Sequence, residues 1–315
     1  MKKRILTGAV IFLITAIFVL SRVYTAYAFD FFVGVLAIMG CVEVTRVLER
    51  KRCFTNIIFV GCFPALMYIA MTIGIANKRE WIHFVLYFVI IFFAMFLINF
   101  LYSYLFTGIT RKEKDKYGVF ESDAKYSFKK AMNSSFVMIY PALLFTALFV
   151  MNHFFDFSFV NSHNFSDTTI VVLFFLILTF AVTMMTDTFA LIVGMTLKGP
   201  KLCPLISPKK TISGAIGGFV FGASSGLLVY YLFSLNTIFN EAISVFNIEW
   251  WKILIISAIA SIIGQIGDLV ASALKRSARV KDYGTIFPGH GGVMDRVDGL
   301  VFNAVVVLIS MFIIL

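Results

Sequence analysis

Long apolar blocks separated by short polar loops dominate this chain from end to end. Apolar runs of about 20 residues, the length needed to cross roughly 30 Å of hydrocarbon, follow one another with few charges inside them. The pattern predicts an all-α, polytopic integral membrane protein with about nine transmembrane helices. The predicted helices cover residues 1–20, 29–48, 56–76, 81–106, 134–151, 169–194, 211–233, 251–274 and 299–315.

The first apolar run could be a secretory signal, because three cations at residues 2–4 precede it and Ala28 could end a cleavage site. A first transmembrane helix is the better interpretation. Further apolar segments follow at once, and no soluble exported domain does.

Composition supports the membrane assignment. Sixty per cent of the residues are apolar and only 14% are charged, whereas about a quarter of a soluble chain is charged. The net charge of +10 lies in short loops, which is typical of membrane topology and anionic headgroups rather than of nucleic-acid binding. The four cysteines are scattered, with no CxxC pair, so neither a zinc site nor a disulfide framework is expected.

The distribution of cations predicts the orientation of the chain. With nine crossings, all but four of the 27 lysines and arginines fall on the side of the N-terminus. The four exceptions are Arg22, Lys78, Arg79 and Lys252. By the positive-inside rule the N-terminus is cytoplasmic and the C-terminus extracytoplasmic. The loops after the second, fourth, sixth and eighth helices therefore face the cytoplasm.

Two aspartates lie inside apolar helices, where a carboxylate is costly unless it is paired or functional. Asp187 and Asp268 each stand about two turns, or about 10 Å, from the cytoplasmic end of their helix. A hydrogen bond between helices is the alternative, structural explanation. Around Asp268 a polar stripe recurs at steps of three and four and must face protein or water. It comprises Ser257, Ser261, Gly264, Asp268, Ser272 and Lys275.

The loop before residue 211 could bind phosphate. Lys209, Lys210, Thr211 and Ser213 stand at a cytoplasmic helix start, where free N–H groups favour anions. The spacing is not that of a Walker loop. Beyond it, glycines every fourth residue predict a seam for close helix packing. These are Gly214, Gly218, Gly222 and Gly226.

The densest set of reactive groups occupies residues 272–298, with five cations, three carboxylates, one histidine and four glycines. Carboxylates without clustered His or Cys suit Mg²⁺, and the cations beside them suit polyphosphate. Together they indicate metal-assisted phosphoryl or nucleotidyl transfer to a lipid. Glu43, near a cytoplasmic helix end, could reach the surface or pair with Arg46. His290 could be an acid, a phosphate donor or a turn-stabilising group.

Residues 272–298 resemble the signature of the phosphatidate cytidylyltransferases, or CDP-diacylglycerol synthases, and meet each of its fixed positions. These positions are Ser272, Lys275, Arg276, Lys281, Asp282, Gly284, Pro288, His290, Gly291, Gly292, Asp295, Arg296 and Asp298. Asp187-Thr188 and residues 207–214 also resemble family elements, although many bacterial members have Glu where Ser213 stands. The resemblance divides the chain into N-terminal helices, 1–168, and a C-terminal catalytic region, 169–315.

The resemblance implies that CTP and phosphatidate give CDP-diacylglycerol and pyrophosphate, by in-line attack of the lipid phosphate on the α-phosphorus of CTP. It implies Mg²⁺ held by Asp268 and Asp295, with Asp298 or Asp187 as further ligands. It also implies a second, monovalent cation such as K⁺, a homodimer, and a cytoplasmic active site in the inner membrane. The implied catalytic residues are Asp268, Lys275, Asp295, Arg296 and His290. The implied substrate-binding residues are Lys209, Lys210, Thr211, Ser213, Ser272, Arg276, Lys281 and Asp282.

Three other functions fit parts of the sequence. A CTP-dependent lipid-alcohol kinase would transfer the γ-phosphate and release CDP. A transporter would place charges at the bilayer midplane, often in two repeated halves, but no repeat is found and the aspartates lie toward one face. A scaffold would have no reason to gather carboxylates and cations at one depth.

Overall fold

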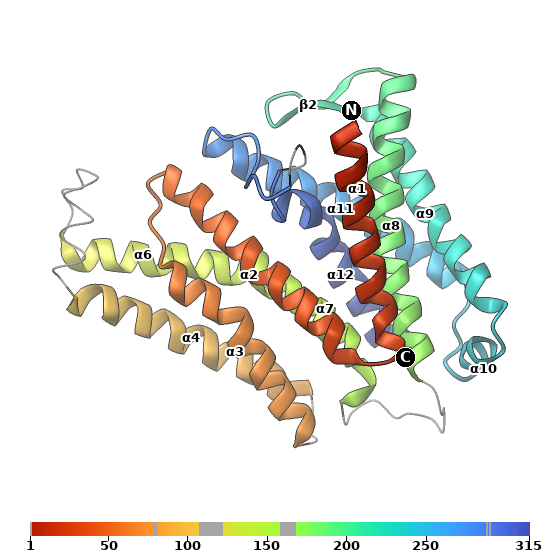
Figure 1. Ribbon diagram of the computed structural model, residues 1–315, viewed down its shortest axis with the longest axis horizontal. Helices are drawn as coiled ribbons and strands as arrows, with labels where there is room; N and C mark the ends of the chain where they lie inside the picture. Colours follow the sequence, from red (N-terminus) through yellow and green to blue (C-terminus); the bar gives the residue numbers. More distant parts are fainter. Residues whose placement is uncertain (1, 78–80, 107–121, 158–167, 288, 290) are drawn as a thin grey trace.

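The computed structural model describes residues 2–77, 81–106, 122–157, 168–287, 289 and 291–315 (Figure 1). These residues form helices, one two-stranded antiparallel hairpin and an isolated bridge between Phe287 and Gly291. The first half contains α1 (Lys2–Leu20), η1 (Ser21–Val23), α2 (Ala26–Arg50), α3 (Ile57–Ala76), α4 (Trp81–Leu105), α6 (Asp123–Val137), η2 (Met138–Leu143), α7 (Leu144–Asn152) and η3 (Phe154–Asp156). The second half contains α8 (Thr168–Thr196), β1 (Lys201–Cys203), β2 (Ser207–Thr211), α9 (Ile212–Ser234), α10 (Thr237–Val245), α11 (Trp250–Ser277) and α12 (Met294–Ile314).

The all-α membrane fold is confirmed. Eight of the described helical segments are long and apolar enough to cross a bilayer, and a shorter apolar helix covers Thr7–Val23. Each coincides with a predicted span. In the view of Figure 1 the N-terminal mark lies near the top of the molecule and the C-terminal mark lies well below it.

Three elements differ from the predicted boundaries. The fifth span begins at Asp123 rather than near residue 134, because the polar helix α6 continues beyond the apolar run and Ser122 caps it. This span kinks at Tyr140, just before Pro141. The last helix begins at Met294 rather than at residue 299, and α10 forms within a predicted loop. Hydropathy marks the apolar part of a helix, not its polar ends.

The glycine seam of α9 is structural, as predicted. A Cβ on Gly218 would lie 2.8 Å from the carbonyl oxygen of Thr186, and one on Gly222 would overlap the hydroxyls of Thr186 and Ser261. Thr186 Oγ1 also donates a hydrogen bond to Ser261 Oγ over 2.9 Å. Small residues therefore hold α8, α9 and α11 in close contact.

The two halves share a core. Helix α12 packs against α7 of the first half as well as against α8 and α11 of the second. Phe145 of α7, Phe174 of α8 and Val301 of α12 belong to the same buried cluster. The division of the chain near residue 168 stays a prediction.

A buried polar cluster joins α2, α3 and the end of α7. His153 Nε2 lies 2.8 Å from Asp30 Oδ2 and His153 Nδ1 lies 2.6 Å from Asp156 Oδ2. Tyr68 and Asn152 donate hydrogen bonds to the same Asp30 carboxylate. Burial lowers the pKa of His153, but the hydrogen bonds to Asp156 and Asp30 outweigh it and raise the pKa to about 9.

Candidate active site

The β1–β2 hairpin carries a lysine to α11. Thr211 ends the hairpin and begins α9, because its hydroxyl accepts a hydrogen bond from the N–H of Gly214 at 3.1 Å. This cap fixes the last residues of β2, and Lys210 Nζ then lies 2.6 Å from Asp268 Oδ2. Both side chains are about one quarter exposed, at 28% each. The predicted phosphate loop and the predicted intramembrane carboxylate therefore belong to one site.

Carboxylates from three helices lie within electrostatic range of one another. The charge of Asp268 interacts with those of Asp187 on α8 and Asp298 on α12. Ser272, one turn along α11, donates a 3.3 Å hydrogen bond to Asp268 Oδ1. Asp298 is buried and accepts a hydrogen bond from the N–H of Gly299. The polar stripe of α11 is buried or half-buried along its length, so it faces protein, as predicted.

Asp295 organises the loop between α11 and α12. Its Oδ1 lies 2.8 Å from Lys275 Nζ, in an ion pair whose side chains are 10% and 3% exposed. Its Oδ2 accepts hydrogen bonds from the N–H groups of Tyr283 and Gly292 at 2.7 and 2.9 Å. Gly291 has a φ of +86°, and a Cβ there would lie 2.6 Å from Asp295 Oδ2. The glycine therefore permits the carboxylate to approach the loop backbone.

Tyr283 and Arg276 fix the same loop to α11. The Tyr283 hydroxyl donates to the carbonyl of Ala271 over 3.0 Å, and Lys275 Nζ lies 5.2 Å from the centre of the Tyr283 ring. Burial raises the pKa of Tyr283 above its ordinary range. The guanidinium of Arg276 donates to the carbonyls of Ile206 and Val280, each at 3.2 Å. Arg276 thus joins the end of α11 to the hairpin turn.

Glu43 of α2 is a part of the site that the sequence prediction misplaced. It does not reach the surface, although the charge of Arg46 acts on it. Instead its side chain is 1% exposed, and its carboxylate accepts hydrogen bonds from the N–H groups of Val293 and Met294 at 2.9 and 2.8 Å. These are free donors of the first turn of α12. This role could have been predicted as for Asp187 and Asp268, because Glu43 is also a carboxylate within an apolar run.

The remaining predicted residues divide into two groups. Ser213 donates to the carbonyl of Lys198 and lies 3.2 Å from Thr211 Oγ1, so both hydroxyls shape the start of α9. The cations and carboxylate with exposed side chains are Lys209, Lys281, Asp282 and Arg296. His290 and Pro288 lie outside the described residues.

The donor set fits Mg²⁺ in part. The described residues contain no group of three or more His, Cys, Asp or Glu side chains arranged to hold a metal ion by themselves. Mg²⁺ needs fewer, because one or two carboxylates together with water and substrate phosphates usually hold it. Asp268, with Asp187 and Asp298 beside it, meets that requirement. Asp295 differs from Asp268 because two backbone N–H groups of the loop donate to it and its side chain is 3% exposed, against 28% for Asp268. This favours an organising role for Asp295.

A sequence profile described as the cytidylyltransferase family matches residues 2–314. This chain belongs to the cytidylyltransferase family. A phosphatidate cytidylyltransferase from Brucella abortus (strain 2308) is 44% identical over 140 residues, which are 44% of this chain and 45% of that protein. One from Staphylococcus haemolyticus is 42% identical over 130 residues, 41% of this chain and 46% of that protein. The matched region thus spans less than half of each relative.

The geometry of this cytidylyltransferase-family member suits the binding of phosphate groups. Lys210 and Lys275 enter from the hairpin and from α11, each in contact with a carboxylate. In such pairs the cations can bind a polyphosphate and the carboxylates can bind a metal ion. Acyl transfer would instead need an activated Ser or Cys nucleophile beside a base, which the described site does not present.

Proposed function

We propose that the chain is a phosphatidate cytidylyltransferase, which converts CTP and phosphatidate into CDP-diacylglycerol and pyrophosphate. The observation that carries the proposal is that Asp187, Asp268 and Asp298 interact electrostatically at one end of three membrane helices, where Lys210 of the hairpin and Lys275 also lie. The names of the relatives support the same reaction.

In this reaction an oxygen of the lipid phosphate forms a bond to the α-phosphorus of CTP. The bond from that phosphorus to the oxygen bridging to the β-phosphorus breaks, and pyrophosphate leaves with the electron pair. No strong general base is needed, because the phosphatidate phosphate is already an anion. The chain's task is positioning and charge neutralisation. Lys210 and Lys275 bind phosphate oxygens, and the exposed cations Lys209, Lys281 and Arg296 hold the triphosphate.

Asp268, with Asp298 and Asp187, would hold Mg²⁺. When bound, the ion neutralises phosphate charge and makes the α-phosphorus more electrophilic. Asp295 could bind the ion only if it released Lys275 or a backbone N–H. We therefore assign Asp295 the role of organising the loop between α11 and α12. A second, monovalent cation such as K⁺ belongs to the same carboxylate group. Thr211, Ser213, Ser272 and Arg276 keep the walls of the site in place, and Asp282 contributes to substrate binding. A catalytic role for His290 stays a prediction.

We place the site at the cytoplasmic face of the bacterial inner membrane, on the evidence of the cation distribution, and we propose a homodimer. Cys203 on the hairpin tests the orientation. A membrane-impermeant thiol reagent should modify Cys203 in inverted vesicles and spare it in intact cells. Modification in intact cells would place the site outside. Cross-linking in native membranes tests the dimer.

The deciding experiment uses membranes containing the protein, phosphatidate and CTP labelled at either the α- or the γ-phosphorus. We expect the α-label to enter the lipid, pyrophosphate to appear in solution, and a chelator of divalent ions to stop both. Entry of the γ-label into lipid with release of CDP would instead establish a lipid-alcohol kinase. Flux of a solute without consumption of CTP would establish a transporter.

A further inference from the structure

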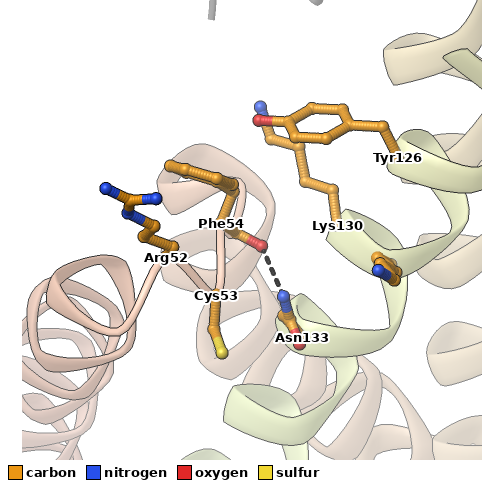
Figure 2. A pocket seen from close by; sticks show the side chains of 7 residues that line it. Arg52, Cys53, Phe54, Tyr126, Lys130 and Asn133 are labelled. Carbon is orange, nitrogen blue, oxygen red and sulfur yellow. Dashed lines mark hydrogen bonds between the residues drawn. The ribbon is translucent and has the colours of Figure 1, made fainter. Parts of the chain in front are cut away.

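A second cationic site lies in the N-terminal half of the chain and shares no lining residue with the candidate active site. A cavity of about 410 Å³ opens between the α2–α3 turn and α6 (Figure 2). Its lining includes Arg52, Cys53 and Phe54 from the turn and Tyr126, Lys130 and Asn133 from α6. Volumes of about 300–1,000 Å³ are usual for small-ligand sites.

The walls of this cavity are held together without any ligand. Asn133 Nδ2 donates to the carbonyl of Phe54 over 3.0 Å, as the dashed line in Figure 2 shows. The N–H of Asn56 donates to Ser134 Oγ at 2.9 Å. The rings of Phe54 and Tyr126 lie 5.6 Å apart and are buried. Because the protein backbone around the cavity is already ordered, binding of a ligand costs little conformational entropy.

The positive charge of the side chains that line the cavity indicates an anionic ligand. Three cationic side chains, those of Arg52, Lys129 and Lys130, line the cavity. Figure 2 shows Arg52 on the side of the turn and Lys130 on the side of α6. A guanidinium, ammonium groups and a phenol facing one space are donors suited to phosphate oxygens.

The position of the cavity selects the source of the phosphate. It lies where α2 ends at Arg50, where α3 begins at Ile57 and where the span that includes α6 begins, so it stands at the boundary of three membrane helices. The cation distribution predicts that this boundary faces the cytoplasm. Anionic phospholipid headgroups lie at that depth. We infer that this cavity binds the phosphate of an anionic membrane lipid, as a site separate from the one that carries the chemistry.

The test is lipid binding by the full-length protein in detergent, measured by native mass spectrometry. Phosphatidylglycerol is the probe, because it is anionic but is not the proposed substrate, and phosphatidylcholine is the comparison. We expect Arg52→Gln/Lys130→Gln to weaken phosphatidylglycerol retention by roughly tenfold or more, given about 1 kcal/mol for each surface cation. The control is Arg50→Gln/Lys51→Gln, which removes two exposed cations beside the cavity. Equal losses in the two variants would overturn the site.

Cys53 gives a second measurement that needs no variant. Its half-buried thiol lines the cavity, so a bound headgroup should slow its alkylation. We expect vesicles containing phosphatidylglycerol to protect Cys53 relative to phosphatidylcholine vesicles and to leave Cys203 unprotected, with the modified peptides identified by mass spectrometry. Equal alkylation of Cys53 in both vesicles would refute the site. Protection by millimolar inorganic phosphate alone would refute its assignment to a lipid.

Discussion

The carboxylate of Glu43 accepts a hydrogen bond from the backbone N–H of Met294 at 2.8 Å, across 251 positions of the chain. It accepts a second from Val293 at 2.9 Å. Glu43 also lies against Gly284 and Gly292, where a Cβ would collide with it. One buried carboxylate of α2 thus connects the middle of the loop between α11 and α12, at Gly284, with the start of α12.

Replacing Glu43 should impair turnover. Hydrogen bonds to a charged group contribute about 1.5–3 kcal/mol each, so Glu43→Ala should release the start of α12 and lower turnover per inserted molecule by about tenfold or more. Glu43→Gln, which keeps the size and one acceptor, should lose less. Glu49→Gln, an exposed change on the same helix, is the control. Unaltered turnover in a fully inserted Glu43→Ala protein would show that this cap does not position the site.

Asp268 and Asp295 should respond differently to magnesium. Asp268→Asn should lower transfer from CTP to lipid by about two orders of magnitude or more and raise the Mg²⁺ concentration at half-maximal rate. Asp295→Asn should also lower the rate, because it breaks the ion pair with Lys275, but without changing the Mg²⁺ requirement.

Rates measured over a range of Mg²⁺ concentrations separate the two roles. Glu241→Gln, an exposed change on α10, is the control and should leave both the rate and the Mg²⁺ dependence unchanged. A raised Mg²⁺ requirement in Asp295→Asn would make Asp295 a metal ligand.

The glycine seam predicts a stability difference between two Gly→Ala changes. A methyl group at Gly222 would overlap Thr186 and Ser261, so Gly222→Ala should destabilise the fold by about 1–3 kcal/mol. A Cβ at Gly61 of α3 has no neighbour within 4 Å, and Gly61→Ala should raise stability slightly, by about 0.5–1 kcal/mol, because Ala favours the helix more than Gly does. The thermal unfolding midpoint in detergent measures both. Equal midpoints for the two variants would contradict close packing at α9.

His153 should make stability depend on pH. Its pKa in the folded chain is about 9 against an ordinary 6.5, so protonation favours folding. The contribution, at most roughly 3 kcal/mol for such a shift, is fully present below pH 6.5 and is lost as the pH rises through 9. The thermal midpoint should therefore fall between pH 6.5 and pH 9.5. In His153→Gln this fall should be smaller, and an identical fall would exclude His153 as its source.

Several features were predictable from sequence because their causes are local. A run of about 20 apolar residues has few stable positions other than across a bilayer, and each predicted span is a helix. Thr211 could be identified as a helix cap from its position before Ile212. The steps of three and four that put Asp268 and Lys275 on one face of α11 follow from helix geometry. The density of charged residues at 272–298 also identified the region of the site, because charge density is a local property of the sequence.

The pairing of side chains was decided by tertiary structure. No local pattern connects Lys210 with Asp268 or Glu43 with Met294, because these contacts depend on how the hairpin folds back and on how α2 crosses α12. Tertiary packing also pairs one oxygen of Asp295 with Lys275 and the other with backbone N–H groups of the loop. These interactions could not be predicted from composition. The sequence by itself determined which segments enter the membrane and which residue types gather at the predicted cytoplasmic ends. The tertiary structure alone decided which of those residues meet, because the energy of a buried charge depends on the partners that other helices bring to it.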